Sequence, residues 1–201
     1  MKVEGRVGSI TGAVGSVNAL RTLPDGSLAV SNAGGKYTEA AIAGRLFGAC
    51  TATPLNTSTT LNTTFVGLGL CNPTGSGKLL ILHEFAYAAD NALATGGSQL
   101  ALAATTDSGF SASVTIRCTR FGYATSVAYV MTSATIVAPV ILKYIAMLGE
   151  TAVTAWQGHP TVVNLGGSIV IAPGRSIVTD TTIAAGATTI SFSYMWEEVS
   201  V

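Results

Sequence analysis

Residues 188–199, with the sequence TTISFSYMWEEV, alternate large apolar side chains with small or polar ones. Ile190, Phe192, Tyr194 and Trp196 occupy every second position, and side chains two residues apart on a β-strand point to the same face of the sheet. The pattern therefore predicts a strand with one buried face. We interpret its aromatic row as part of the hydrophobic core rather than as a platform for a ligand.

Short apolar runs of the same kind recur along the chain after residue 64. Gly, Pro, Asn and Asp separate them, as in β-sandwiches and barrels. The sequence therefore predicts an all-β domain over residues 65–201, a jelly-roll-like antiparallel β-sandwich. The predicted strands are residues 65–70, 78–88, 99–104, 114–119, 127–131, 136–148, 161–165, 168–172, 176–179 and 188–199.

Residues 1–64 are rich in Gly, Thr and other small residues, and we expect them to form an extended N-terminal arm. Within the arm, residues 37–47 (YTEAAIAGRLF) favour a short helix because of their alanines and the spacing of Ile42 and Leu46. Residues 51–64 (TATPLNTSTTLNTT) have no apolar face and predict an extended Thr/Asn-rich linker. On this division, removing residues 1–50 should leave the β-domain intact.

The chain is unusually poor in charge. Charged residues make up 10% of it, whereas globular proteins use about 25% and place most of them on the surface. Much of this surface is therefore expected to lie against other protein. The formal net charge is zero, so no overall field attracts nucleic acid or an anionic membrane. The longest apolar run, residues 136–148, is too short to span a bilayer, and residues 1–6 do not resemble a secretion signal. We expect no nucleic-acid and no membrane partner.

No set of reactive side chains has the spacing of a known catalytic or metal site. The residues considered are Cys50, Cys71, Cys118, His83, His159, Glu197 and Glu198. The cysteines are interpreted as small buried hydrophobes, and the histidines are isolated in sequence. A nucleophile paired with either histidine stays open, because the members of a triad need not be neighbours. The adjacent glutamates would point to opposite faces of a strand and are expected at a solvated edge. The sequence predicts no catalytic residue, no cofactor and no metal.

Residues 72–78 (NPTGSGK) resemble a phosphate-binding loop, which needs G-x-x-x-x-G-K followed by Ser or Thr and a helix. Asn72 stands where the first glycine belongs, and Leu79 replaces the Ser or Thr that would hold magnesium. The following residues, LLILHEFAYA, favour a strand. We therefore interpret the segment as a hairpin turn with Lys78 at its edge.

The order of several motifs resembles a family of virion-associated structural proteins of tailed bacteriophages. The motifs are GKYTEAA (35–41), FVGLGLCNPTGSGK (65–78), TDSGF (106–110), PGRS (173–176) and FSYMWEE (192–198). The similarity extends over most of the chain from about residue 34. It implies a virion location, and it assigns no functional residues.

In that setting we expect a capsid decoration or cement protein on the capsid surface. Its expected partners are other copies of itself, as a homotrimer, and the major capsid protein or another virion protein. The alternative is a head-fibre, tail-fibre or receptor-binding module anchored by its N-terminal arm, with Tyr123, Tyr129 and Trp156 as candidate glycan contacts. A virion-bound hydrolase would need clustered carboxylates, and the ten acidic residues are scattered.

Overall fold

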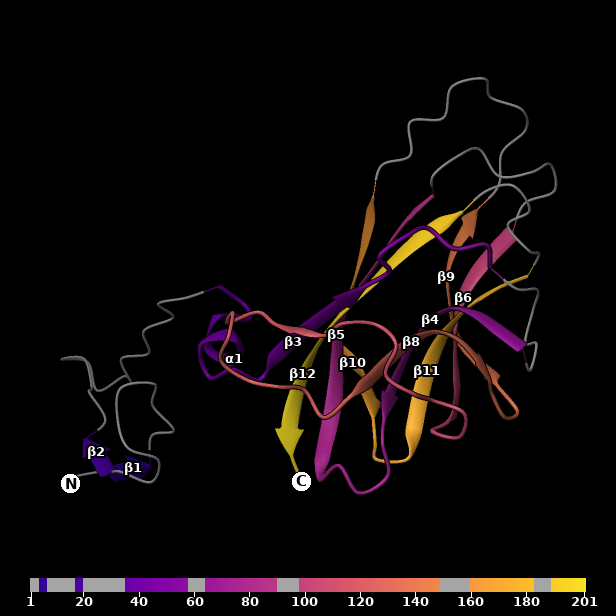
Figure 1. The fold of residues 1–201 in the computed structure, drawn as a ribbon. Helices are drawn as coiled ribbons and strands as arrows, with labels where there is room; N and C mark the ends of the chain where they lie inside the picture. Colours follow the sequence, from indigo (N-terminus) through magenta and orange to yellow (C-terminus); the bar gives the residue numbers. More distant parts are fainter. Residues whose placement is uncertain are drawn as a thin grey trace.

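The computed structural model describes residues 4–6, 17–19, 35–57, 64–89, 98–148, 160–182 and 189–201 (Figure 1). These residues form one short helix, α1 (Thr38–Ile42), and twelve strands. The strands are β1 (Glu4–Arg6), β2 (Val17–Ala19), β3 (Leu46–Cys50), β4 (Thr64–Asn72), β5 (Lys78–Ala89), β6 (Ser98–Thr106), β7 (Arg117–Cys118), β8 (Tyr129–Thr135), β9 (Val140–Leu148), β10 (Thr161–Ile171), β11 (Arg175–Thr181) and β12 (Ile190–Ser200).

Ten of these strands form two five-stranded antiparallel sheets that pack face to face. The first sheet has the order β10-β5-β12-β3-β7 and the second has the order β8-β4-β11-β6-β9. Strands β3 to β6 alternate between the two sheets, and strands β9 to β12 return in the same way. Each outgoing strand pairs with a returning one: β3 with β12, β4 with β11, β5 with β10 and β6 with β9. This rolled-up pairing is the jelly-roll arrangement, so the predicted fold class is confirmed.

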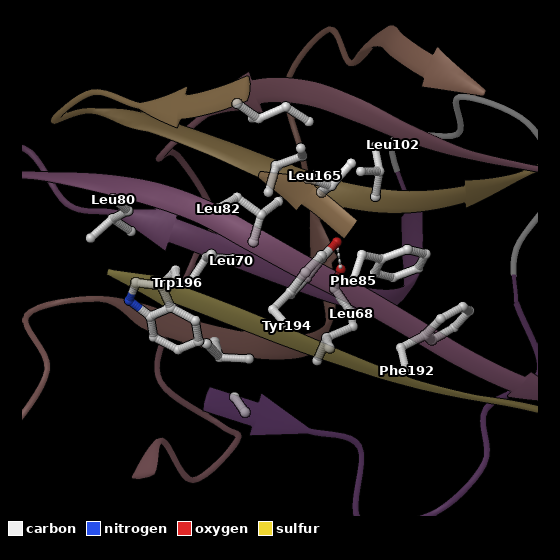
Figure 2. Packing of buried hydrophobic residues seen from close by; sticks show 14 of the residues in the cluster. Leu68, Leu70, Leu80, Leu82, Phe85, Leu102, Leu165, Phe192, Tyr194 and Trp196 are labelled. Atoms are coloured by element: carbon white, nitrogen blue, oxygen red, sulfur yellow. Dashed lines mark hydrogen bonds between the residues drawn. The ribbon is translucent and has the colours of Figure 1, made fainter. Parts of the chain in front are cut away.

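The core lies between the sheets and is built around the aromatic row of β12. Ile190, Phe192, Tyr194 and Trp196 are buried, and the intervening residues of β12 are less so. Figure 2 shows Phe192, Tyr194 and Trp196 packed among leucines of β4 and β5. Phe85 of β5 lies with its ring centroid 5.4 Å from that of Tyr194. The prediction that this row forms core is confirmed.

A bulge in β4 is closed by two side chains of the core. The pairing of β4 with β8 shifts register between Val66 and Gly69. Within this break, the Leu68 N–H donates to the Thr179 hydroxyl (2.8 Å) and the Leu68 carbonyl accepts from the Tyr194 hydroxyl (3.1 Å; Figure 2). Buried backbone groups need such partners. The bulge therefore depends on residues from two other strands.

The helix is shorter than predicted. It ends at Ile42, and Gly44 follows with a φ of +71°, a left-handed conformation that stops a helix. Leu46 and Phe47, expected on the helix, belong to β3 and are buried against the sheet. Phe47 packs into the core between the sheets and Leu46 is buried on the opposite side of β3, and this burial outweighs the local helical preference of the alanines before them.

The sandwich begins earlier in the chain than the expected boundary after residue 64. Strand β3 pairs with β12 over five residues and also with β7. Beyond β3, Leu55 forms a bridge with Ile190, and buried Thr57 accepts a hydrogen bond from the Thr181 hydroxyl (2.8 Å). Residues 46–57 are thus part of the sandwich rather than of an arm or a free linker. Apart from the small β1–β2 hairpin, the expected arm up to residue 34 lies outside the described residues.

Four of the predicted strands need correction. Residues 161–165 and 168–172 form a single strand, β10, interrupted by an irregularity around Gly166 and Gly167, whose φ angles are positive. The strand expected over residues 136–148 begins only at Val140, because Pro139 has no N–H to give to a ladder. Residues 114–119 contribute only the two-residue β7.

Candidate functional site

Residues 72–78, which resemble a phosphate-binding loop in sequence, form a structural turn. Strands β4 and β5 lie in different sheets, so residues 73–77 cross from one sheet to the other and the expected hairpin is wrong. Strand β5 follows the turn, as predicted. The buried Asn72 amide donates to the carbonyls of Lys78 and Ile171, both at 2.8 Å. The Lys78 ammonium donates to the Ser200 hydroxyl (3.1 Å) at the surface. Through its two hydrogen bonds, Asn72 of β4 links β5 and β10 at this end of the sandwich.

Asp107 joins this turn to two others at the same end of the sandwich. Its carboxylate accepts hydrogen bonds from the Thr74 hydroxyl (2.7 Å) and the Thr74 N–H (2.9 Å). The Asp107 N–H donates to the Gly174 carbonyl (3.2 Å), and the Gly174 N–H donates to the Asn72 carbonyl (2.8 Å). The hydroxyl and N–H of Thr74, with a smaller contribution from the nearby Arg175 charge, lower the pKa of Asp107. The ionised carboxylate is thus the form that ties the turns together.

We expect the Asp107→Asn variant to be less stable than the native chain at neutral pH and indistinguishable from it in acid. A carboxyl whose pKa is lowered by folding stabilises the fold above its unfolded pKa of about 3.9, and that contribution is lost as the pH falls through the folded value. The melting temperatures of the two chains, compared between pH 7 and pH 2.5, should therefore converge in the acid range. A gap that stays constant over this range would contradict the role given to the charge.

His83 is not isolated in space. Its ring lies 4.6 Å from that of Tyr37, and its Nε2 is 3.4 Å from a carboxylate oxygen of Glu197. The other Glu197 oxygen pairs with the Arg45 guanidinium at 3.0 Å. His83 Nδ1 and the Tyr37 hydroxyl are buried without a hydrogen-bond partner among the described residues. The cluster brings an imidazole and a carboxylate together, but within the described residues no Ser, Thr or Cys side chain is hydrogen-bonded to His83. It fastens the segment around α1 to the outer face of the first sheet.

The glutamates of β12 point to opposite sides, as predicted, but the expectation of a solvated edge is wrong. Glu198 is only 4% exposed, and its carboxylate accepts hydrogen bonds from the Ser126 hydroxyl and the Val127 N–H. Glu197 is held by Arg45 and His83 on the other side. Each carboxylate therefore anchors a different segment to β12.

The remaining reactive groups do not converge. Cys71 and Cys118 are buried, as predicted, whereas Cys50 is exposed, and all three thiols are free. Burial raises the pKa of Cys71 and so keeps it protonated. No group of three or more His, Cys, Asp or Glu residues within the described ranges could hold a metal ion. His159 and Trp156 lie outside the described residues.

The loop between β7 and β8 presents exposed aromatic side chains. Phe121 is 87% exposed, and Tyr123 and Tyr129 are also exposed. The Arg120 guanidinium stacks on the Tyr123 ring, 3.9 Å from its centroid. A groove of about 580 Å³ is lined by residues that include Arg117, Phe121, Ser126 and Tyr129. Tyr123 and Tyr129 were expected to be exposed here, whereas Phe121 and Arg117 were missed; the run RFGY (120–123) could have drawn attention to Phe121 but not to Arg117.

A second groove, also of about 580 Å³, opens at the edge of the sandwich where β9 of one sheet lies near β10 of the other. Its lining is mostly apolar and includes Val140 and Leu142 of β9 and Ile169, Val170 and Ile171 of β10. Several apolar residues of these strands are exposed. They are Val140, Leu142, Tyr144, Met147, Val162 and Val170. Together with Val137 we call them the edge patch. The sequence suggested contact surfaces in general but did not locate this one.

Comparison with known proteins adds no relative. No family model, no curated protein and no solved structure matches the chain. In the described part of the chain, no helix is long and apolar enough to cross a membrane.

Proposed function

We propose that the protein is a structural component of a phage virion, a capsid decoration protein that binds the shell as a homo-oligomer and stabilises it. The observation that carries the proposal is the edge patch on a chain with only 10% charged residues. Exposed apolar surface at a sheet edge makes a free monomer prone to aggregation, whereas in an oligomer it can form the contact between subunits. The resemblance of the ordered sequence motifs to virion-associated proteins gives the setting.

The physical basis of such a role is mass action. A protein that binds assembled shell subunits, and not dissociated ones, stabilises the assembly by a free energy that rises with the logarithm of its free concentration relative to Kd. We expect two five-stranded sheets, joined by hydrogen-bonded turns, to behave as a rigid body. Rigid bodies lose little conformational freedom on binding, so more of the contact energy remains as affinity.

Quantitative mass spectrometry of purified particles tests the proposal. We expect about one copy of this chain per major shell subunit, because a cement protein occupies equivalent sites over the whole shell. The major shell protein itself is the internal standard. A ratio of a few per cent would contradict the cement role and would indicate a fibre or tail component.

The groove between β7 and β8 favours that second candidate, a receptor-binding module. Exposed aromatic rings beside arginine and hydroxyl side chains offer stacking and hydrogen bonds to a sugar ring. Binding of host surface glycans by the full chain, and its loss in Phe121→Ala, would support this function. Undiminished glycan binding by Phe121→Ala would remove the groove from consideration.

A further inference from the structure

We infer that the edge patch binds a second copy of this chain. The inference deepens the proposed function and rests on its oligomer, because it names the surface through which the copies associate. The patch lies along β9 and β10, each of which is an edge strand of its sheet. Figure 1 shows that β9 and β10 belong to opposite layers of the sandwich.

The patch is large and nearly without charge. Met147 is 77% exposed, Val140 65% and Tyr144 57%. The exposed fractions of the seven residues amount to roughly 700 Å² of accessible surface, close to the ~800 Å² that each partner contributes to a standard interface. The area is thus sufficient for a specific contact.

The groove beneath the patch leads into the core. It reaches Ile171 and Ile177, which are buried between the sheets, and Val140, Leu142 and Val170 form its exposed wall. A side chain entering the groove would meet apolar surface continuous with the core. Anchors that fill such pockets carry most of the energy of an interface.

Irregularities in β9 turn apolar side chains outwards. The pairing of β9 with β6 shifts register twice, between Leu100 and Ala101 and between Leu102 and Ala103 of β6. A bulge changes the direction of the side chains next to it. The consecutive residues Leu142, Lys143 and Tyr144 are all exposed, which simple alternation would not allow. Sheet edges are usually blunted by charged side chains, proline or a covering segment, whereas β9 carries one lysine among exposed apolar side chains.

Charge and composition favour a second copy over another partner. The described residues lining the groove include Arg175 and no carboxylate, and Lys143 is the only charged residue of β9. Both cations are exposed and can keep their charge in water. The formal net charge of the chain is zero, so two copies do not repel each other. Interfaces between identical subunits are the more apolar class, and this patch has that character.

Sedimentation velocity of the full chain tests the inference. We expect the native protein to be oligomeric at micromolar concentration and Leu142→Glu to weaken association by about 30-fold or more, the effect of losing a central anchor. Phe121→Glu is the matched control, because it places the same charge on an exposed apolar site outside the patch. It should assemble like the native chain. Tyr144→Glu provides a second test within the patch should Leu142→Glu fail to fold.

Three results would overturn the inference: a monomeric native protein at high concentration, unchanged assembly of folded patch variants, or dissociation by Phe121→Glu instead. Hydrogen exchange adds a direct readout, since the outer amides of β9 should lose protection when the oligomer is diluted. The inferred interface and the proposed cement role can be contradicted independently of each other. Self-association is measured without particles, whereas a low copy number on particles would contradict the cement role and leave the oligomer intact.

Discussion

Deleting residues 1–50 is expected to prevent the sandwich from folding, whereas deleting residues 1–34 should leave it folded. The shorter deletion stops before Gly35, where the described part leading into α1 begins. The longer deletion removes β3, which lies between β12 and β7 in the first sheet. The two truncations therefore separate the expected arm from the true start of the domain.

The loss of β3 is severe because it is both buried and hydrogen-bonded. Leu46 and Phe47 are almost fully buried, and the Phe47 ring stacks on that of Trp196 with centroids 6.2 Å apart. Each large buried side chain contributes about 1.5–3 kcal/mol. The backbone of β12 would also lose its pairing with β3 over five residues. Against a total stability of about 5–15 kcal/mol, these losses together are expected to abolish folding.

Circular dichroism and the hydrogen-exchange protection of β12 measure the outcome. The 1–34 deletion should keep a cooperative melt and slow exchange in β12, and the 1–50 deletion should show neither. A folded, cooperative 1–50 deletion would mean that β3 is dispensable and that the boundary after residue 64 was the better description. The internal control is the full chain under the same conditions.

Sequence patterns correctly predicted the structural features that depend on residues close together in the chain. The alternation in residues 190–196 identified both the strand and its buried face, because the period of side chains along a strand is local. The turn at residues 73–77 was located correctly but misread as a hairpin. Gly, Pro and Asn allow the chain to reverse, yet they do not determine whether the next strand joins the same sheet or the opposite one.

Sequence patterns did not predict contacts between residues that are far apart in the chain. His83 and Glu197 are 114 positions apart, and only the pairing of β5 with β12 brings them together. The burial of Glu198 likewise depends on hydrogen bonds from Ser126 and Val127, which the loop before β8 places beside it. The helix prediction failed at Leu46 for the same reason, since burial in a sheet overrode local preference. The edge patch arises from the order of strands in two sheets, which no single segment encodes.

Replacing Trp196 by alanine should cost about 3–5 kcal/mol of the free energy of unfolding, the usual loss for a buried tryptophan. The side chain is fully buried in the core (Figure 2), and its ring stacks on that of Phe47. Alanine would leave a cavity at the centre of the first sheet, where β3, β5 and β12 meet. Chemical denaturation with urea gives the measurement, with the midpoint expected to fall and the slope to stay unchanged.

Phenylalanine at the same position should cost much less, within about 1 kcal/mol, because two effects oppose each other. The smaller ring loses packing, but the Trp196 indole N–H has no hydrogen-bond partner among the described residues. Removing a buried unpaired donor recovers part of its desolvation penalty of about 1–3 kcal/mol. Trp196→Phe should therefore lie far closer to the native chain than to Trp196→Ala.

Tyr194→Phe is the matched comparison, since it removes a hydroxyl that does have a partner. That hydroxyl donates to the Leu68 carbonyl inside the β4 bulge, and burial raises the pKa of Tyr194 so that the donor stays protonated. Its loss leaves the carbonyl buried and unpaired, at a cost of about 1–3 kcal/mol. Tyr194→Phe should thus be more destabilising than Trp196→Phe although it deletes fewer atoms. The reverse order would show that volume, rather than hydrogen bonding, determines the stability of the aromatic row.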